Sequence, residues 1–121
     1  MANPVVHFEI LGKDGKALQD FYSSLFDWKI NSDNPMNYGL VETGASGDGI
    51  NGGVGDGDGS SWATFYVQSD DLPASLSKVE ELGGRTLVPP QELPMGISIA
   101  LFEDPEGHVV GLVTPRPEAQ S

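Results

Sequence analysis

Two residues near the start of the chain are suited to acid–base chemistry. His7 and Glu9 lie one residue apart within the apolar run Val5–Ile10. Because side chains alternate between the two faces of a strand, His7 and Glu9 project from one face, while Phe8 and Ile10 project from the other. An imidazole beside a carboxylate can orient a polar ligand or transfer a proton. His7 and Glu9 are the candidate catalytic residues, and the alternative for His7 is a structural histidine that hydrogen-bonds to the backbone.

A weaker copy of this segment begins at Thr64. Its residues match the first segment at one constant offset, pairing Phe8 with Phe65, Ile10 with Val67, Ala17 with Ala74 and Leu25 with Leu82. Two copies of one supersecondary unit predict a pseudo-symmetric protein with a seam between the copies. The polar residues of the second copy that correspond to the His7 and Glu9 face are Thr64, Tyr66 and Gln68. We expect these five side chains to face a concave surface and to bind a ligand there.

Hydrophobic periodicity predicts the elements that carry these residues. In the first half, Leu18, Phe21, Tyr22 and Leu25 follow the spacing of one helix face, which indicates a helix over about 16–26. Runs of apolar and β-branched residues predict the strands. They lie at about 5–10, 28–30, 38–42 and 50–54 in the first half and 62–67, 85–88, 97–102 and 109–113 in the second.

Turn and cap residues set the boundaries in the second half. Asp70 or Asp71 can cap a helix that begins near residue 72 and ends at Gly83–Gly84. Pro89–Pro90 is expected to end the strand that precedes it, because proline cannot donate to a sheet ladder. His108 follows a tight turn, and we interpret it as a turn residue.

Each half of the chain is thus predicted to contain one strand, one helix and three further strands. We predict an α+β fold of two βαβββ modules, at about residues 4–56 and 61–115, which form a curved mixed sheet with the helices outside. The 121 residues are expected to form a single domain, with residues 116–121 as a frayed tail.

The composition excludes several classes of function. Six basic against 18 acidic residues give a net charge of −12, which repels nucleic acids and anionic membranes. The chain has no cysteine, so it can form no disulfide, thiolate metal site or cysteine nucleophile. Neither a signal peptide nor a membrane-spanning run is visible in the sequence. We therefore expect a cytoplasmic protein without nucleic-acid or membrane partners.

Five sequence segments resemble the vicinal oxygen chelate superfamily, which contains glyoxalase I, bleomycin-resistance proteins and extradiol dioxygenases. The segments are His7–Ile10, Ala17–Trp28, Gly49–Gly53, Glu80–Gly84 and Ala100–Leu112. They cover nearly the whole chain. The resemblance implies two βαβββ modules and a homodimer with its clefts at or near the subunit contact.

The metal enzymes of this superfamily take one ligand from each of four strands. Carried over by position, these ligands fall on His7, Gly53, Thr64 and Gly111. In the region of the second expected ligand, residues 50–54, Asn51 is the side chain that can coordinate an ion or bind a ligand. A single imidazole with weak neutral oxygens lacks the three or more protein ligands of a stable divalent site. We therefore expect no cofactor, although a divalent metal stays an alternative.

The sequence supports two functions of different classes. The first is a metal-independent, bleomycin-resistance-like protein that binds a small and partly aromatic molecule in a concave cleft. The second is an enzyme of the lyase, isomerase or dioxygenase type, with or without a divalent metal.

Overall fold

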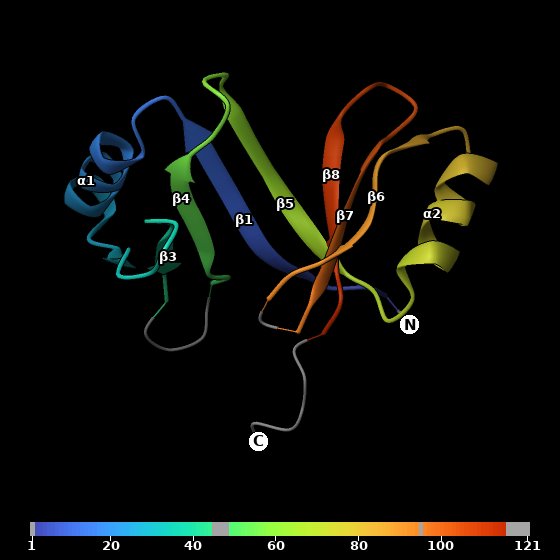
Figure 1. Cartoon of the computed structure of the whole chain (residues 1–121), viewed down its shortest axis with the longest axis horizontal. Coiled ribbons are helices and arrows are strands. Elements are labelled where there is room, and N and C mark those ends of the chain that lie inside the picture. Colours follow the sequence, from blue (N-terminus) through green and yellow to red (C-terminus); the bar gives the residue numbers. More distant parts are fainter. Residues whose placement is uncertain (1, 45–48, 95, 116–121) are drawn as a thin grey trace. The chain divides into compact units, whose positions relative to one another are not determined.

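The computed structural model describes residues 2–44, 49–94 and 96–115 (Figure 1). The chain divides into two compact units. The first unit is Val6–Phe65, and the second unit combines Met1–Val5 with Tyr66–Ser121. The tail expected at 116–121 lies outside the described residues. Within the described ranges, no helix is long and apolar enough to cross a lipid bilayer.

The first module has the predicted order of strand, helix and three strands. Its elements are β1 (Val5–Gly12), α1 (Gly15–Phe26), β2 (Lys29–Asn31), β3 (Gly39–Glu42) and β4 (Gly52–Asp56). The strands are ordered β2-β3-β4-β1. β1 runs parallel to β4, and the other two pairings are antiparallel. The parallel register places Glu9 directly beside Gly53.

Two aspartates define the ends of α1. Asp14 caps the helix, since its Oδ1 accepts a hydrogen bond of 3.0 Å from the backbone N–H of Ala17. Asp27 ends the helix in the left-handed conformation with φ 61°, and its N–H donates to the carbonyl of Ser23. The helix therefore agrees with the predicted bounds to within one residue.

The apolar stripe of α1 is only partly buried. Phe21 and Leu25 are each 57% exposed, whereas Tyr22 stacks on Trp28 with ring centroids 5.7 Å apart. The buried residues of α1 are instead Gly15 and Gln19. A Cβ atom on Gly15 would lie 2.6 Å from the backbone N of Asp56, so the start of the helix can approach β4 closely. Close packing through the Gly15 and Gln19 face leaves Phe21 and Leu25 at the surface.

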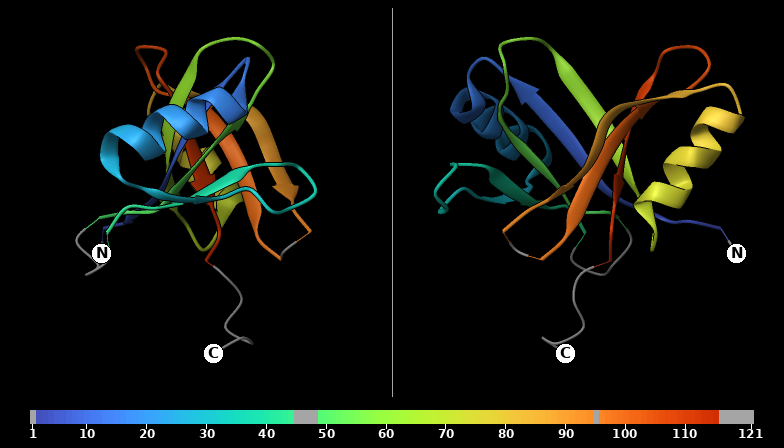
Figure 2. Two further views of the ribbon diagram at one scale, coloured as in Figure 1. Left: turned by 90° about the vertical axis from the view of Figure 1, so that its left-hand side faces the viewer. Right: turned by 45° about the vertical axis from the view of Figure 1, so that its right-hand side comes forward.

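The second module repeats the same order of elements. They are β5 (Trp62–Gln68), α2 (Leu72–Glu81), β6 (Arg85–Glu92), β7 (Ser98–Glu103) and β8 (Val109–Val113), with strand order β5-β8-β7-β6. Asp71, one of the two predicted caps, accepts a hydrogen bond from the N–H of Ala74. α2 packs against β6 and β7 (Figure 2). The core between helix and strands consists of Leu72, Leu76, Ala100 and Leu112.

The prediction that Pro89–Pro90 ends its strand is wrong. β6 continues through both prolines to Glu92. It pairs with β7 alone, at the edge of its sheet order, and its register shifts between Val88 and Gln91. Because the prolines lie at this irregularity on an edge strand, their missing N–H groups remove no regular ladder bond.

The turn before β8 confirms the structural interpretation of His108. The backbone N–H groups of His108 and Glu106 donate to Asp104 Oδ1 over 3.0 and 2.9 Å, and His108 Nδ1 lies 2.9 Å from Asp104 Oδ2. The hydrogen bond from the His108 backbone N–H holds the pKa of the Asp104 carboxyl below its usual range. His108 thus closes a turn and stays at the surface.

Candidate functional site

Four side chains of the first unit form one hydrogen-bonded group, which we call the His7 cluster. Its members are His7, Glu9, Tyr38 and Trp62. His7 Nε2 lies 3.0 Å from the hydroxyl of Tyr38, and this hydroxyl donates to Glu9 Oε2 over 3.0 Å. The indole Nε1 of Trp62 donates to Glu9 Oε1, also over 3.0 Å. The cluster therefore joins a titratable imidazole to a carboxylate through a phenol.

The cluster is assembled from three separate parts of the sequence. β1 contributes His7 and Glu9, whose common partner Tyr38 is consistent with their expected position on one strand face. Tyr38 immediately precedes β3, and Trp62 begins β5. All four side chains are half-buried. Hydrogen bonds in such partly dehydrated surroundings are stronger than in bulk water, which favours a fixed arrangement.

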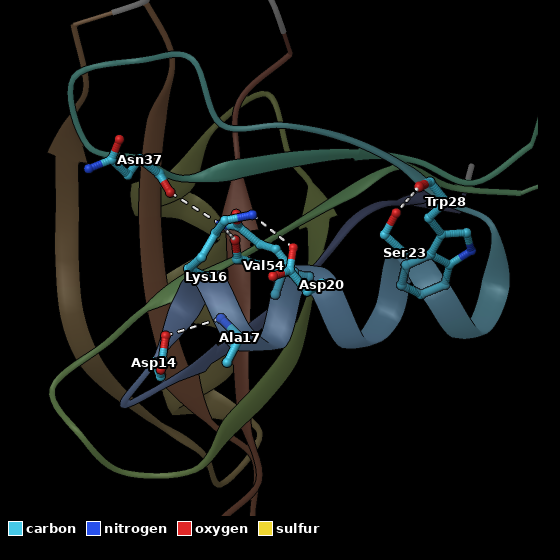
Figure 3. A network of polar contacts seen from close by, with 9 residues as sticks. Asp14, Lys16, Ala17, Asp20, Ser23, Trp28, Asn37 and Val54 are labelled. Atoms are coloured by element: carbon cyan, nitrogen blue, oxygen red, sulfur yellow. Dashed lines mark hydrogen bonds and ion pairs between the residues drawn. The ribbon is translucent and has the colours of Figure 1, made fainter.

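The backbone of Tyr38 is held by the turn before it. Asn34 Oδ1 accepts the N–H of Tyr38 over 3.0 Å, and Asn34 Nδ2 donates to the Tyr38 carbonyl over 2.7 Å. Gln19 of α1 donates to the carbonyls of Asn37 and Val54 over 3.2 and 2.8 Å, the contacts drawn as dashed lines to these two residues in Figure 3. The side chains of Asn34 and Gln19 thus fix the phenol relative to β4.

Gly53 makes room for the phenol. A Cβ atom on Gly53 would overlap the hydroxyl and ring of Tyr38, so the ring lies directly over the backbone of β4. Gly53 is also the register partner of Glu9 on the neighbouring strand. The missing side chain at position 53 therefore allows the Tyr38 hydroxyl to lie between His7 and Glu9.

The second module also places a tyrosine ring over a strand glycine. Tyr66 on β5 pairs with Gly111 on the parallel strand β8, and a Cβ atom on Gly111 would overlap the Tyr66 ring. Tyr66 is only 7% exposed. Gln68, the next polar residue of this strand face, pairs with Val113, and its backbone binds Pro4 and Asn3. Tyr66 and Gln68, two of the predicted ligand-binding residues, thus belong to the second unit.

Two other predicted residues have local contacts within the first unit. The side-chain oxygen of Asn51 accepts the N–H of Thr43 over 3.1 Å and so connects the ends of β3 and β4. The hydroxyl of Thr64 lies 3.5 Å from the carbonyl of Phe65. Of the six predicted ligand-binding residues, the hydrogen bonds described above bring His7 and Glu9 together.

The residues present do not fit a divalent metal at the expected positions. Gly53 and Gly111 carry no donor atom, and a tyrosine ring covers each of them. Thr64 offers a neutral hydroxyl, which leaves His7 as the strong donor of the four. No group of three or more His, Cys, Asp or Glu residues within 2–44, 49–94 and 96–115 could hold an ion. The side chains present at these four positions can form hydrogen bonds but do not together make a divalent metal site.

Trp62 connects the His7 cluster to two open cavities of the first unit. The smaller, of about 230 Å³, is lined by Leu11, Gly57, Asp58, Ser60 and Trp62. The larger, of about 720 Å³, lies between the start of α1 and residues 59–63, with Ile10, Leu18, Phe21 and Trp62 among its lining residues. Hydrogen bonds from the side chain and backbone of Ser60 lower the pKa of Asp58. An apolar wall with an ionised carboxylate therefore borders Trp62.

The sequence profile of the glyoxalase-like domain matches residues 8–113. The chain belongs to the glyoxalase-like domain family. This match confirms the resemblance to the vicinal oxygen chelate superfamily. Glu9, Tyr38 and Trp62 of this glyoxalase-like protein lie inside the matched region, and His7 immediately precedes it. None of the curated proteins matches the chain.

Solved structures confirm the α+β fold of the family. The methylmalonyl-CoA epimerase of Streptomyces coelicolor in complex with 2-nitronate-propionyl-CoA is 18% identical, with a TM-score of 0.66 over 94% of this chain and 95% of that one. The epimerase of Mycobacterium tuberculosis is 15% identical, with a TM-score of 0.68 over 96% and 90%. A glyoxalase/bleomycin resistance protein/dioxygenase superfamily member from Vibrio splendidus 12B01 is 14% identical, with a TM-score of 0.64 over 94% and 100%. At these identities the likeness shows the fold alone.

Sequence reasoning missed Tyr38 and undervalued Trp62. The sequence indicates Tyr38 and Trp62 only as the first residues of the strands at 38–42 and 62–67. The signal for Tyr38 was the glycine pair Gly52–Gly53, because glycine inside a strand often marks the close approach of another group. The signal for Trp62 was its indole N–H, which usually finds an acceptor when it is partly buried.

Proposed function

We propose that this glyoxalase-like protein binds a small, partly aromatic molecule at the His7 cluster without a metal ion. The observation that carries the proposal is the position of Tyr38, which covers Gly53 and hydrogen-bonds between His7 and Glu9. The two side chains that could coordinate a metal ion, His7 and Glu9, are thereby both hydrogen-bonded to Tyr38. Polar groups at fixed positions beside the aromatic face of Trp62 suit a ligand with one aromatic and one polar part.

A second candidate function is metal-free proton transfer. It is favoured by the chain of hydrogen bonds from Glu9 through Tyr38 to His7, which resembles the base-and-orienter arrangement of acid–base enzymes. The structural neighbours include methylmalonyl-CoA epimerases, one of them in complex with methylmalonyl-CoA. A lyase or isomerase that uses His7 and Glu9 as acid and base is the corresponding proposal for this chain.

We expect the purified protein to contain far less than one transition metal ion per chain after loading with Ni²⁺ or Zn²⁺ and gel filtration. Elemental analysis measures the metal.

The Trp28→Phe variant leaves Trp62 as the one indole, and its fluorescence should respond to members of a panel of small aromatic acids and phenols. The same panel is assayed for turnover by mass spectrometry.

The controls separate the outcomes. Trp62→Phe in the Trp28→Phe background should abolish the fluorescence response, and His7→Ala should weaken binding measured by calorimetry. Stoichiometric metal that is lost in His7→Ala would contradict the proposal. Turnover that disappears in His7→Ala and Glu9→Gln while the fold persists would instead establish the second candidate function.

We further propose that the protein is a homodimer in the cytoplasm. The support for the dimer is the exposure of Phe21, Leu25 and Phe26 on one helix, each more than half exposed. Exposed apolar groups that lie together are typical of contact surfaces. Sedimentation velocity at micromolar concentration should give the mass of two chains, and Phe21→Ser with Leu25→Ser should shift it towards one. A monomer in the unmodified protein would contradict this proposal.

A further inference from the structure

The hydrogen bonds of the His7 cluster are compatible with one order of donors. Each carboxylate oxygen of Glu9 accepts one hydrogen bond. Trp62 N–H donates to Oε1, and the Tyr38 hydroxyl donates to Oε2. A hydroxyl has a single proton. Once Tyr38 donates that proton to Glu9, its oxygen can only accept from His7.

We infer that Tyr38 is a positioning residue through which Glu9 sets the tautomer of His7. The neutral imidazole carries its proton on Nε2, which faces the Tyr38 oxygen at 3.0 Å. The second ring nitrogen, Nδ1, is then the acceptor or base of the imidazole. The inference rests on the proposed function, because it describes the same site and specifies its chemistry.

This tautomer fixes the hydrogen-bonding role of the second ring nitrogen of His7. A hydroxyl or N–H group can pair with an unprotonated Nδ1, whereas a carbonyl or carboxylate oxygen would meet its lone pair and be repelled. The inferred tautomer therefore matches Nδ1 to hydrogen-bond donors, such as a phenol or an amine.

Two features of the fold keep Tyr38 in this role. Asn34 binds both the N–H and the carbonyl of Tyr38, which fixes the origin of the side chain. The ring lies over Gly53, and Gly53 is the register partner of Glu9. The phenol is thus positioned from its backbone and from the neighbouring strand, so its hydroxyl remains between carboxylate and imidazole.

The ¹⁵N spectrum of the His7 ring tests the inference. The chain has two histidines, and His108→Gln removes the signal of the surface turn, so that His7 alone is observed. In this background, above the pH at which imidazoles are protonated, we expect only the pattern of a protonated Nε2 and an unprotonated Nδ1. Tyr38→Phe keeps a ring over Gly53 but removes the hydroxyl, and the Nδ1–H tautomer should then appear.

Two further variants make the result specific. In Glu9→Gln the new amide can donate to Tyr38, which lets the hydroxyl donate to His7, and the Nδ1–H tautomer should again appear. Tyr22→Phe removes a hydroxyl from the same unit outside the cluster and should leave the spectrum unchanged. A predominant Nδ1–H tautomer in the parent, or an unchanged tautomer in both Tyr38→Phe and Glu9→Gln, would overturn the inference. Metal content is measured separately, so failure of the tautomer and failure of metal independence are distinguishable.

Discussion

Replacing Gly52 by alanine is expected to destabilise the first unit by about 3 kcal/mol, at the upper end of the usual cost of overpacking. The added Cβ atom would lie 2.5 Å from the carbonyl oxygen of Phe8 and 2.5 Å from its ring. Gly52 pairs with Phe8 on β1 and with Val41 on β3, so this strand cannot move without breaking ladder bonds on both sides. Denaturant unfolding followed by circular dichroism gives the free energy of unfolding.

Gly55→Ala is the matched control for this substitution. Gly55 lies on the same strand and is also buried, but its added Cβ atom would lie 3.4 Å from Tyr38 Cδ1, an ordinary contact distance. We expect the free energy of unfolding to change by less than about 1 kcal/mol. Equal losses in the two variants would show that the destabilisation comes from placing alanine in β4 rather than from the contact with Phe8.

The arrangement of elements could be predicted from the sequence because the information is local. Alternation along β1 predicted that His7 and Glu9 share a face, and both bind Tyr38. Asp71 confirms a cap that its residue type predicts. The strand through Pro89–Pro90 could not be predicted, since it depends on β6 being an edge strand with a shifted register.

The centre of the site could not be predicted because it depends on contacts between strands. Tyr38 reaches His7 and Glu9 only because Gly53, on the next strand, lacks a side chain. In the second module Tyr66 covers Gly111, which is its own register partner on the neighbouring strand. A sequence shows two glycines and two tyrosines, but which ring covers which glycine is decided by strand pairing. Two of the four expected metal-ligand positions, Gly53 and Gly111, are consequently places where a tyrosine ring packs.

Gly53→Ala is expected to keep the fold but to expel the Tyr38 ring from the His7 cluster. The added Cβ atom would overlap the hydroxyl end of Tyr38, a side chain that can rotate away, whereas Gly52 faces backbone. His7 and Glu9 would lose their common partner, and the restriction of His7 to the Nε2–H tautomer would be lost. The free energy of unfolding should fall by about 1–3 kcal/mol, the usual range for overpacking.

A double-mutant cycle with Tyr38→Ala isolates this contact. In the Tyr38→Ala background the space over β4 is already open, so Gly53→Ala should cost about 1 kcal/mol less than in the parent. Denaturant unfolding of the four proteins gives the coupling free energy between the two positions. If Gly53→Ala costs the same in both backgrounds, the Tyr38 ring does not lie over Gly53 in solution. The phenol would then have no fixed place between Glu9 and His7, and the imidazole would have no group to set its tautomer.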